Sequence, residues 1–133
     1  TEGHLIADEL LEDNARTIVG PVISERCKPE LRNHTIETAG ILNKAGVPMC
    51  ICTDHPVVPE QYLPLSAGLA VRGGLDRNEA LKAITIYPAQ ITGIADRVGS
   101  IEVGKDADIV IFSGDPLSVC DTPDMVIVNG TVI

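Results

Sequence analysis

The amino-acid sequence predicts an α/β fold with parallel strands, and three observations lead to this class. Helix-like and strand-like segments alternate through the first part of the chain, and this order implies parallel strands joined by crossover helices. Two of these segments are nearly unbroken apolar runs of strand length. Aromatic residues make up only 2% of the chain, so the core must consist of Ile, Leu, Val and Ala, as in parallel sheets buried on both faces.

The first half of the chain alternates two predicted helices with two predicted strands. In order, these are a helix at His4–Asn14, a strand at Thr17–Val19, a helix at Thr35–Ala45 and a strand at Val47–Thr53. The first helix carries one apolar stripe, formed by Leu5, Ile6, Leu10 and Leu11. Gly46 follows the second helix, at a position where a left-handed residue is preferred.

The second half contains predicted helices followed by short β-type runs. The helices are Leu63–Gly73, a helix opened by Asp76, and a short one from Tyr87-Pro88 to Gly93, and the β-type runs are Ser100–Val103, Ile109–Phe112 and Met125–Ile133. Asp76 is the predicted N-cap, with Glu79 at the third helical position. Asn129-Gly130 is a two-residue hairpin signal. We therefore divide the chain into an α/β part at 1–97 and a β-rich part at 98–133.

Two parallel strands cannot close a barrel or form a well-covered sheet by themselves. Residues 1–97 are therefore expected to be the end of a larger α/β fold, and the chain to be a fragment. If it stood alone, apolar surface that packs on other strands would be exposed. We expect a homo-oligomer, or the missing N-terminal part of the protein, to cover that surface.

Composition excludes some classes of partner. The net charge of −9 argues against a nucleic-acid or anionic-membrane surface, which would need clustered Lys and Arg. No apolar run approaches the roughly 18 residues that span a bilayer. Four cysteines form neither a CxxC pair nor a small disulfide framework: Cys27, Cys50, Cys52 and Cys120. They indicate reduced, buried thiols in a cytoplasmic protein.

Asp54 is the clearest candidate for catalysis, because it directly follows the second apolar strand. Catalytic groups of parallel α/β proteins gather at the carboxyl ends of strands, although an Asp there can equally cap a loop or a helix. Strand alternation places Cys50, Cys52 and Asp54 on one face and His55 on the other. Asp54 and His55 are then not expected to bind one ion unless the chain bends sharply. A Cys-x-Cys-x-Asp metal site is the alternative to buried core cysteines, which are commoner.

The remaining candidates lie near the first strand. His4 and His34 are each expected on the surface, although His34 lies beside the charged loop that follows the strand and could face a ligand. Arg26 in that loop, with Lys28 and Arg32, could bind a substrate carboxylate, or the loop could simply be solvated. Phosphate-binding glycine loops, nucleophile elbows and HExxH motifs are absent from the sequence.

Four stretches together resemble the C-terminal portion of amidohydrolases, in the imidazolonepropionase-like and Xaa-Pro dipeptidase-like branch. They are Thr53–Pro56, Pro88–Gly93, Val98–Phe112 and Val126–Ile133. The resemblance implies a metal-dependent (β/α)8 TIM barrel beside a small β-sandwich built from both chain ends. Thr17–Val19 would be the seventh barrel strand and Val47–Thr53 the eighth.

The same resemblance implies a role for Asp54 and a reaction. Asp54 would bind metal, most often zinc, and act as acid and base, passing a proton from the attacking water to the leaving group of a small amide or dipeptide-like substrate. His55, His34 and Arg26 are candidate substrate-binding residues. The other metal ligands of the family have no matching position, and a hydrolytic zinc normally needs three protein ligands. We therefore expect the isolated chain to be inactive and to bind no metal firmly.

Two alternatives stay open. The chain could be an acidic, non-catalytic α/β interaction module that retains a relict Asp54. It could also be one half of a split enzyme, in which case metal would bind only after the halves are mixed.

Overall fold

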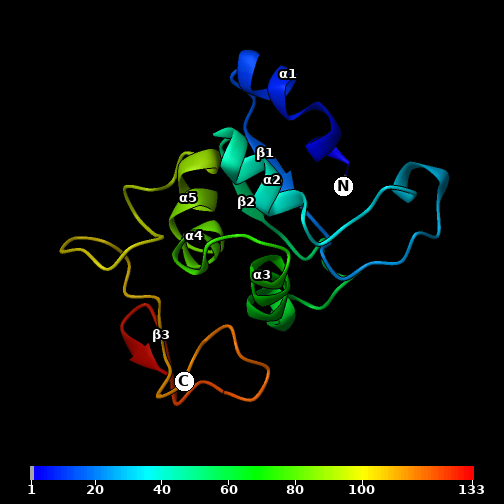
Figure 1. Cartoon of the computed structure of the whole chain (residues 1–133). Helices are drawn as coiled ribbons and strands as arrows, with labels where there is room; N and C mark the ends of the chain where they lie inside the picture. The colour runs from blue at the N-terminus through cyan, green and yellow to red at the C-terminus, as the bar shows by residue number, and fades with distance from the viewer. Residues whose placement is uncertain (1) are drawn as a thin grey trace.

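Helices cover one face of a two-stranded parallel sheet, and a three-stranded antiparallel sheet follows them, in the computed structural model of residues 2–133 (Figure 1). The helices are α1 (Ala7–Glu12), α2 (Thr38–Ala45), α3 (Leu63–Arg72), α4 (Arg77–Ala83) and α5 (Ile86–Thr92). The strands are β1 (Thr17–Val19), β2 (Met49–Ile51), β3 (Ile109–Ile111), β4 (Met125–Val128) and β5 (Thr131–Val132). Short 3-10 turns lie at Gly3–Ile6, Pro29–Leu31 and Glu60–Tyr62. The predicted α/β class is confirmed.

The parallel pair places β1 beside β2 in the register Ile18 to Cys50 and Val19 to Ile51. Pairing continues one residue further, because the Cys52 amide donates to the Val19 carbonyl at 2.9 Å. Val19 and Ile51 are buried in the core against the helices. On the opposite face Ile18 is 58% exposed. Its register partner Cys50 on β2 is 3% exposed, so within residues 2–133 this face is uncovered at β1 but not at β2.

Small residues let the helices approach each other and the sheet closely. Four fully buried alanines supply this contact on α3 and α4: Ala67, Ala70, Ala80 and Ala83. Asp76 caps α4 as predicted, since its carboxylate accepts from the amides of Asn78 at 2.8 Å and Glu79 at 3.2 Å. Glu79 does not complete a capping box; it accepts instead from the Tyr87 hydroxyl at 2.5 Å and from Lys82 at 2.8 Å. The bond from Tyr87 joins α4 to α5, and the bond from Lys82 lies within α4; neither closes the first turn.

Two predicted elements differ from the structure. The first helix is short, and Leu5, Ile6 and Leu11 of its stripe are exposed, whereas Leu10 packs against the core. Residues Ser100–Val103 form no strand. The Ser100 hydroxyl instead donates to Glu102 at 2.5 Å and accepts from Lys105 at 2.6 Å, and such local side-chain bonds favour a turn over strand pairing.

The antiparallel sheet has the order β3-β4-β5. Asn129 and Gly130 have φ values of 49° and 77°, as a tight hairpin between β4 and β5 requires. Leu117, in the loop before β4, is buried in the core formed by the helices, and Asp115 pairs with Arg77. The β-rich part is thus attached to the helices through this loop, while the boundary at 97/98 stays a prediction.

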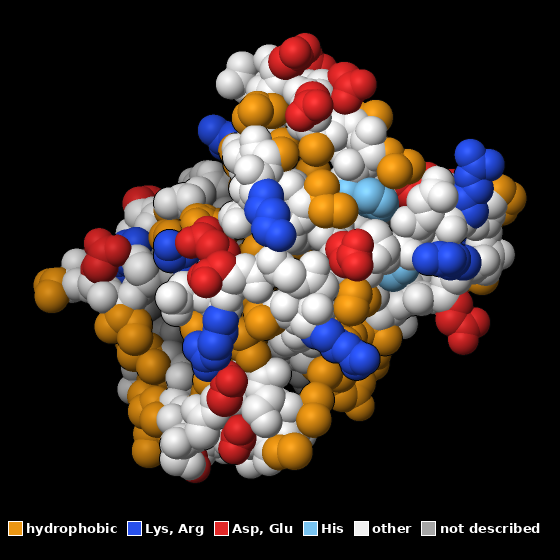
Figure 2. Space-filling view, in the orientation of Figure 1, with side chains coloured by type: hydrophobic (Ala, Val, Ile, Leu, Met, Phe, Trp, Pro, Cys, Tyr) orange, Lys and Arg blue, Asp and Glu red, His pale blue; other side chains and the backbone are white. Residues whose placement is uncertain are grey.

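Charged side chains are unevenly distributed over the surface. Figure 2 shows acidic side chains gathered over α1, and both basic and acidic ones on the loop between β1 and α2. All four cysteines are free, and Cys50 is buried and Cys52 half-buried. Cys27 and Cys120 are exposed, so the prediction of four buried thiols is wrong for these two, which lie in loops. Among residues 2–133 no helix has the length and apolar character needed to cross a membrane.

Candidate active site

The carboxyl ends of β1 and β2 lie at one edge of the sheet because the two strands are parallel. The loop that follows β1 and the segment that follows β2 both leave the sheet on this side (Figure 1). Asp54 comes from the second of these segments, and His34 and Arg26 come from the first. The three candidate site residues therefore lie on segments that leave the sheet at the same edge. In parallel α/β folds the catalytic residues are found at this edge.

Asp54 lies in a left-handed turn with φ 56°, and the Val57 amide donates to its carbonyl at 2.8 Å. The strand ends at Ile51, so regular alternation does not extend to Asp54, and the face that the Asp54 carboxylate shares with Cys50 and Cys52 stays a prediction. Left-handed backbone is uncommon outside glycine, and Asp is among the few residues that adopt it readily. The exposed carboxylate accepts no hydrogen bond from residues 2–133, so the structure does not support a capping role.

Two thiols at this edge, Cys50 in β2 and Cys52 directly after it, have raised pKa values. Burial raises the pKa of Cys50, and the neighbouring Cys52 raises it further. Burial also raises the pKa of Cys52; the Asp54 amide opposes this shift, and the Asp54 carboxylate adds to it. No group of three metal-binding side chains that includes Cys50, Cys52 and Asp54 occurs among residues 2–133. The alternative of a Cys-x-Cys-x-Asp metal site therefore receives no support from the described residues.

Gly20 brings the loop after β1 directly against the strand that carries Asp54. A Cβ atom on Gly20 would lie 2.2 Å from the carbonyl oxygen of Cys52 and 2.7 Å from its sulfur. Only a residue without a side chain fits this contact. Gly20 directly follows β1 in the sequence, and no local pattern reveals that the backbones of two distant segments touch here.

His34 and Arg26 are both engaged with the backbone. His34 is only 8% exposed, so the expectation of a surface histidine is wrong, and its ring Nε2 lies 3.1 Å from the carbonyl oxygen of Pro21. Arg26 donates from Nε at 3.2 Å and from Nη2 at 2.9 Å to the carbonyl oxygen of His34. Arg26 and its neighbours in the loop are nevertheless exposed, as a solvated loop requires, and a role of Arg26 in binding substrate stays a prediction.

The other two histidines differ in environment. His55 is exposed beside Asp54, and its side chain makes no hydrogen bond to the described part of the chain. His4 is partly buried, with Nδ1 3.0 Å from the Thr38 hydroxyl. It ties the N-terminal turn to the start of α2, as a structural histidine does.

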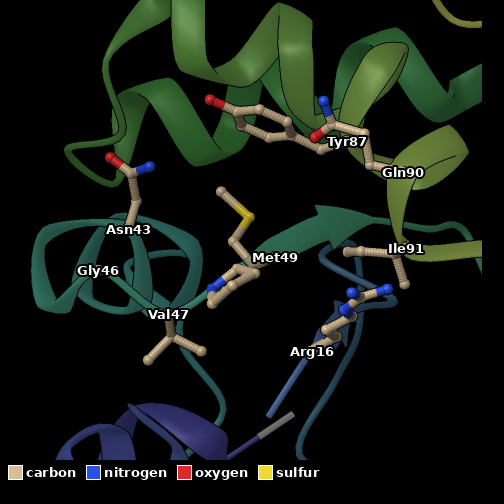
Figure 3. Close-up of a pocket in the computed structure, with 9 residues that line it drawn as sticks. Arg16, Asn43, Gly46, Val47, Met49, Tyr87, Gln90 and Ile91 are labelled. Atoms are coloured by element: carbon tan, nitrogen blue, oxygen red, sulfur yellow. The ribbon is translucent and has the colours of Figure 1, made fainter. Parts of the chain in front are cut away.

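A hollow of about 360 Å³ lies at the opposite, amino end of β2 (Figure 3). Asn43, Met49, Tyr87 and Gln90 line it, and Figure 3 shows the Met49 side chain pointing toward α4 and α5. None of the predicted site residues contributes to it. A wider apolar groove of about 800 Å³ separates α3 and α4 from the β-rich part.

The residues described here do not make up a metal centre. No group of three or more His, Cys, Asp and Glu side chains in residues 2–133 lies close enough to hold an ion. Asp54 could supply one metal ligand, because its carboxylate is exposed at the carboxyl edge of the sheet. Any further ligands would have to come from another part of the protein, since three protein ligands are usual for a hydrolytic zinc.

Comparison with known proteins defines the family. The amidohydrolase family model matches residues 4–133, and the chain belongs to this family. It is 35% identical over 104 residues to the amidohydrolase tasK of Hapsidospora irregularis, which covers 78% of this chain and 11% of that protein. It is 41% identical over 70 residues to the imidazolonepropionase of Thermoplasma acidophilum, which covers 51% of this chain and 17% of that protein.

Solved structures agree with this assignment. The crystal structure of an amidohydrolase from Thermotoga maritima matches with a TM-score of 0.95 and 39% identity, over 100% of this chain and 35% of that one. A prolidase complexed with N-methylphosphonate-L-proline shares the fold, with a TM-score of 0.71 and 21% identity over 98% of this chain and 37% of that one. The resemblance to amidohydrolases is confirmed, and the chain spans between 11% and 37% of these four proteins.

Proposed function

We propose that the whole protein is a metal-dependent hydrolase that cleaves an amide or cyclic amide C–N bond, with Asp54 as its acid and base. The position of Asp54 carries this proposal. Its carboxylate follows β2 at the carboxyl edge, in a left-handed turn. It is exposed and accepts no hydrogen bond from the described residues. Membership of the amidohydrolase family supports hydrolysis as the class of reaction.

The role of Asp54 is to move one proton twice. As a carboxylate it accepts the proton of the attacking water, and as a carboxylic acid it then donates that proton to the leaving nitrogen. A divalent cation, zinc by analogy with the family, would polarise the carbonyl and favour deprotonation of the water. A nearby cation also favours the ionised form of Asp54. His55 is the nearest further side chain in the sequence and is proposed to contact substrate.

The incomplete site supports the proposal that this chain is inactive alone. In this assignment β1 and β2 are barrel strands seven and eight, and residues 98–133 belong to the sandwich. Two apolar surfaces would then contact the rest of the protein. One is the sheet face around Ile18, which is 58% exposed, and the other is the groove between α3, α4 and the β-rich part. A split enzyme with two separate halves would show the same two surfaces.

The names of the relatives suggest the substrate class. Imidazolonepropionase and prolidase are among the proteins matched, so small cyclic amides and dipeptides are the proposed substrates. Free cysteines support the proposed cytoplasmic location. Family membership favours the hydrolase over the non-catalytic module with a relict Asp54.

Metal removal and replacement test the proposed function. The whole protein is assayed against a cyclic amide and a panel of dipeptides, before and after dialysis with a chelator. We expect hydrolysis that is lost on chelation and returns with zinc. Hydrolysis that is unaffected by complete removal of metal would refute the metal dependence, and a protein inactive with every metal would refute the hydrolase.

A further inference from the structure

The loop between β1 and α2 is closed by a chain of contacts from Arg26 through His34 to Pro21. The Arg26 guanidinium donates twice to the His34 carbonyl, at 2.9 Å and 3.2 Å. The His34 ring then reaches the Pro21 carbonyl at 3.1 Å. We call these three residues the loop clamp. The clamp joins Pro21 at the start of the loop to His34 near its end, and His34 to Arg26 in its middle.

The chemistry of the clamp determines the state of His34. A carbonyl oxygen only accepts hydrogen bonds, so the His34 Nε2 atom must carry a proton and donate it. His34 is 8% exposed, so water competes little for this bond. The backbone amide of His34 donates to the Leu31 carbonyl at 2.9 Å. The residue is thereby held by its ring, its amide and its carbonyl.

The clamp connects to the strand that carries Asp54. Pro21 directly follows Gly20, whose backbone packs against Cys52 so closely that a Cβ would lie 2.2 Å from the Cys52 carbonyl oxygen. Cys52 in turn lies two residues before Asp54. A shift of the loop at Pro21 would therefore act through the contact between Gly20 and Cys52 on the segment that positions the Asp54 carboxylate.

We propose that Arg26 and His34 are positioning residues, which hold the loop from Pro21 to His34 as a fixed wall beside Asp54, and that neither of them binds substrate. This inference rests on the proposed hydrolase function of the site. It replaces the sequence-based expectation that both residues face a ligand. The Nε and Nη2 atoms that would form a fork on a substrate carboxylate are already used on the His34 carbonyl.

Kinetics of clamp variants in the whole protein test the proposal. We expect Arg26→Ala and His34→Ala each to lower kcat/KM by roughly 10- to 100-fold through displacement of the loop, and the double variant to be no worse than either. Non-additive loss is the signature of residues that act through one unit. Additive losses would show two independent substrate contacts and overturn the proposal.

A pair of isosteric variants adds a rescue. Glutamine places its amide nitrogen at a reach similar to Nε2, whereas the asparagine amide stops near Nδ1. We expect His34→Gln to recover most of the kcat/KM that His34→Asn loses, and Glu30→Gln, on an exposed residue of the same loop, to serve as control. Equal losses in the glutamine and asparagine variants would contradict a donor at Nε2.

Amide hydrogen exchange separates this inference from the proposed function, because it needs no activity. Exchange of residues 22–33 in the whole protein should become faster in Arg26→Ala and His34→Ala, and equally so in both. A melting temperature that falls without faster exchange in the loop would overturn the clamp. An inactive wild-type protein with the expected exchange would instead refute the hydrolase and leave the clamp supported.

Discussion

Replacing Gly20 by alanine tests the contact between the loop and the strand that carries Asp54. The added Cβ would lie 2.2 Å from the Cys52 carbonyl oxygen and 2.7 Å from the Cys52 sulfur. The first of these atoms belongs to the backbone of β2's continuation, which pairs with Val19 through the Cys52 amide. The strand cannot move aside without weakening that pairing, so the loop and the strand must separate.

The required separation follows from the geometry. Non-bonded atoms rest at roughly 3.5 Å, so a contact of 2.2 Å demands a displacement of roughly 1 Å. Overpacking of this kind destabilises a protein by about 1–3 kcal/mol. A displacement of about 1 Å near a catalytic group lowers the rate by roughly 100-fold. Both losses are expected together in the whole protein.

Urea unfolding and steady-state kinetics of the whole protein measure the two effects. Gly3→Ala is the matched control, because its Cβ would meet only the ends of two side chains, Leu10 at 3.4 Å and Leu42 at 4.0 Å, which are ordinary contacts. Wild-type stability and kcat/KM in Gly20→Ala would refute the close contact. A loss of stability with unchanged kcat/KM would show that the contact does not position Asp54.

Three further predictions concern stability and are measured by denaturant or thermal unfolding. Leu42 is 1% exposed in the core, so Leu42→Ala should lower the free energy of unfolding by about 2–5 kcal/mol. A decrease below about 1 kcal/mol would contradict the burial of Leu42. Asp76→Ala should cost about 0.5–2 kcal/mol by removing the N-cap of α4, and an unchanged midpoint would contradict the two cap bonds. Hydrogen bonds from Lys82 and then from Tyr87 lower the pKa of Glu79 below its ordinary 4.5. Because the folded-state pKa is the lower one, this stabilisation is present above the unfolded value and is lost as the pH falls through the folded value. The difference in melting temperature between wild type and Glu79→Gln should therefore shrink on acidification, and a constant difference would contradict the ionic role of Glu79.

Elements with local signals could be predicted from the sequence. Asp76 caps its helix through its own side chain, and Asn129-Gly130 adopts the positive φ values of a tight hairpin. Both depend on residues within a few positions of each other. Gly46 ends α2 in the left-handed conformation for the same reason.

Features that depend on distant segments could not be predicted in this way. The apolar run up to Thr53 predicts a longer strand, but β2 ends at Ile51 and Asp54 lies in left-handed backbone. The burial of His34 depends on Pro21, thirteen residues earlier. Ile101 is 83% exposed in a segment that reads as a strand but has no strand neighbour among the described residues. Such outcomes are decided by tertiary packing rather than by propensity.

The central claim is that Asp54 is the acid and base of the hydrolase, and Asp54→Asn in the whole protein tests it most directly. Asparagine keeps the size of the side chain and tolerates the left-handed turn, but it cannot take up a proton. We expect kcat to fall by roughly 100- to 10,000-fold, while Asp13→Asn, an exposed carboxylate at the end of α1, retains wild-type kcat. A folded Asp54→Asn protein with wild-type kcat would contradict the claim.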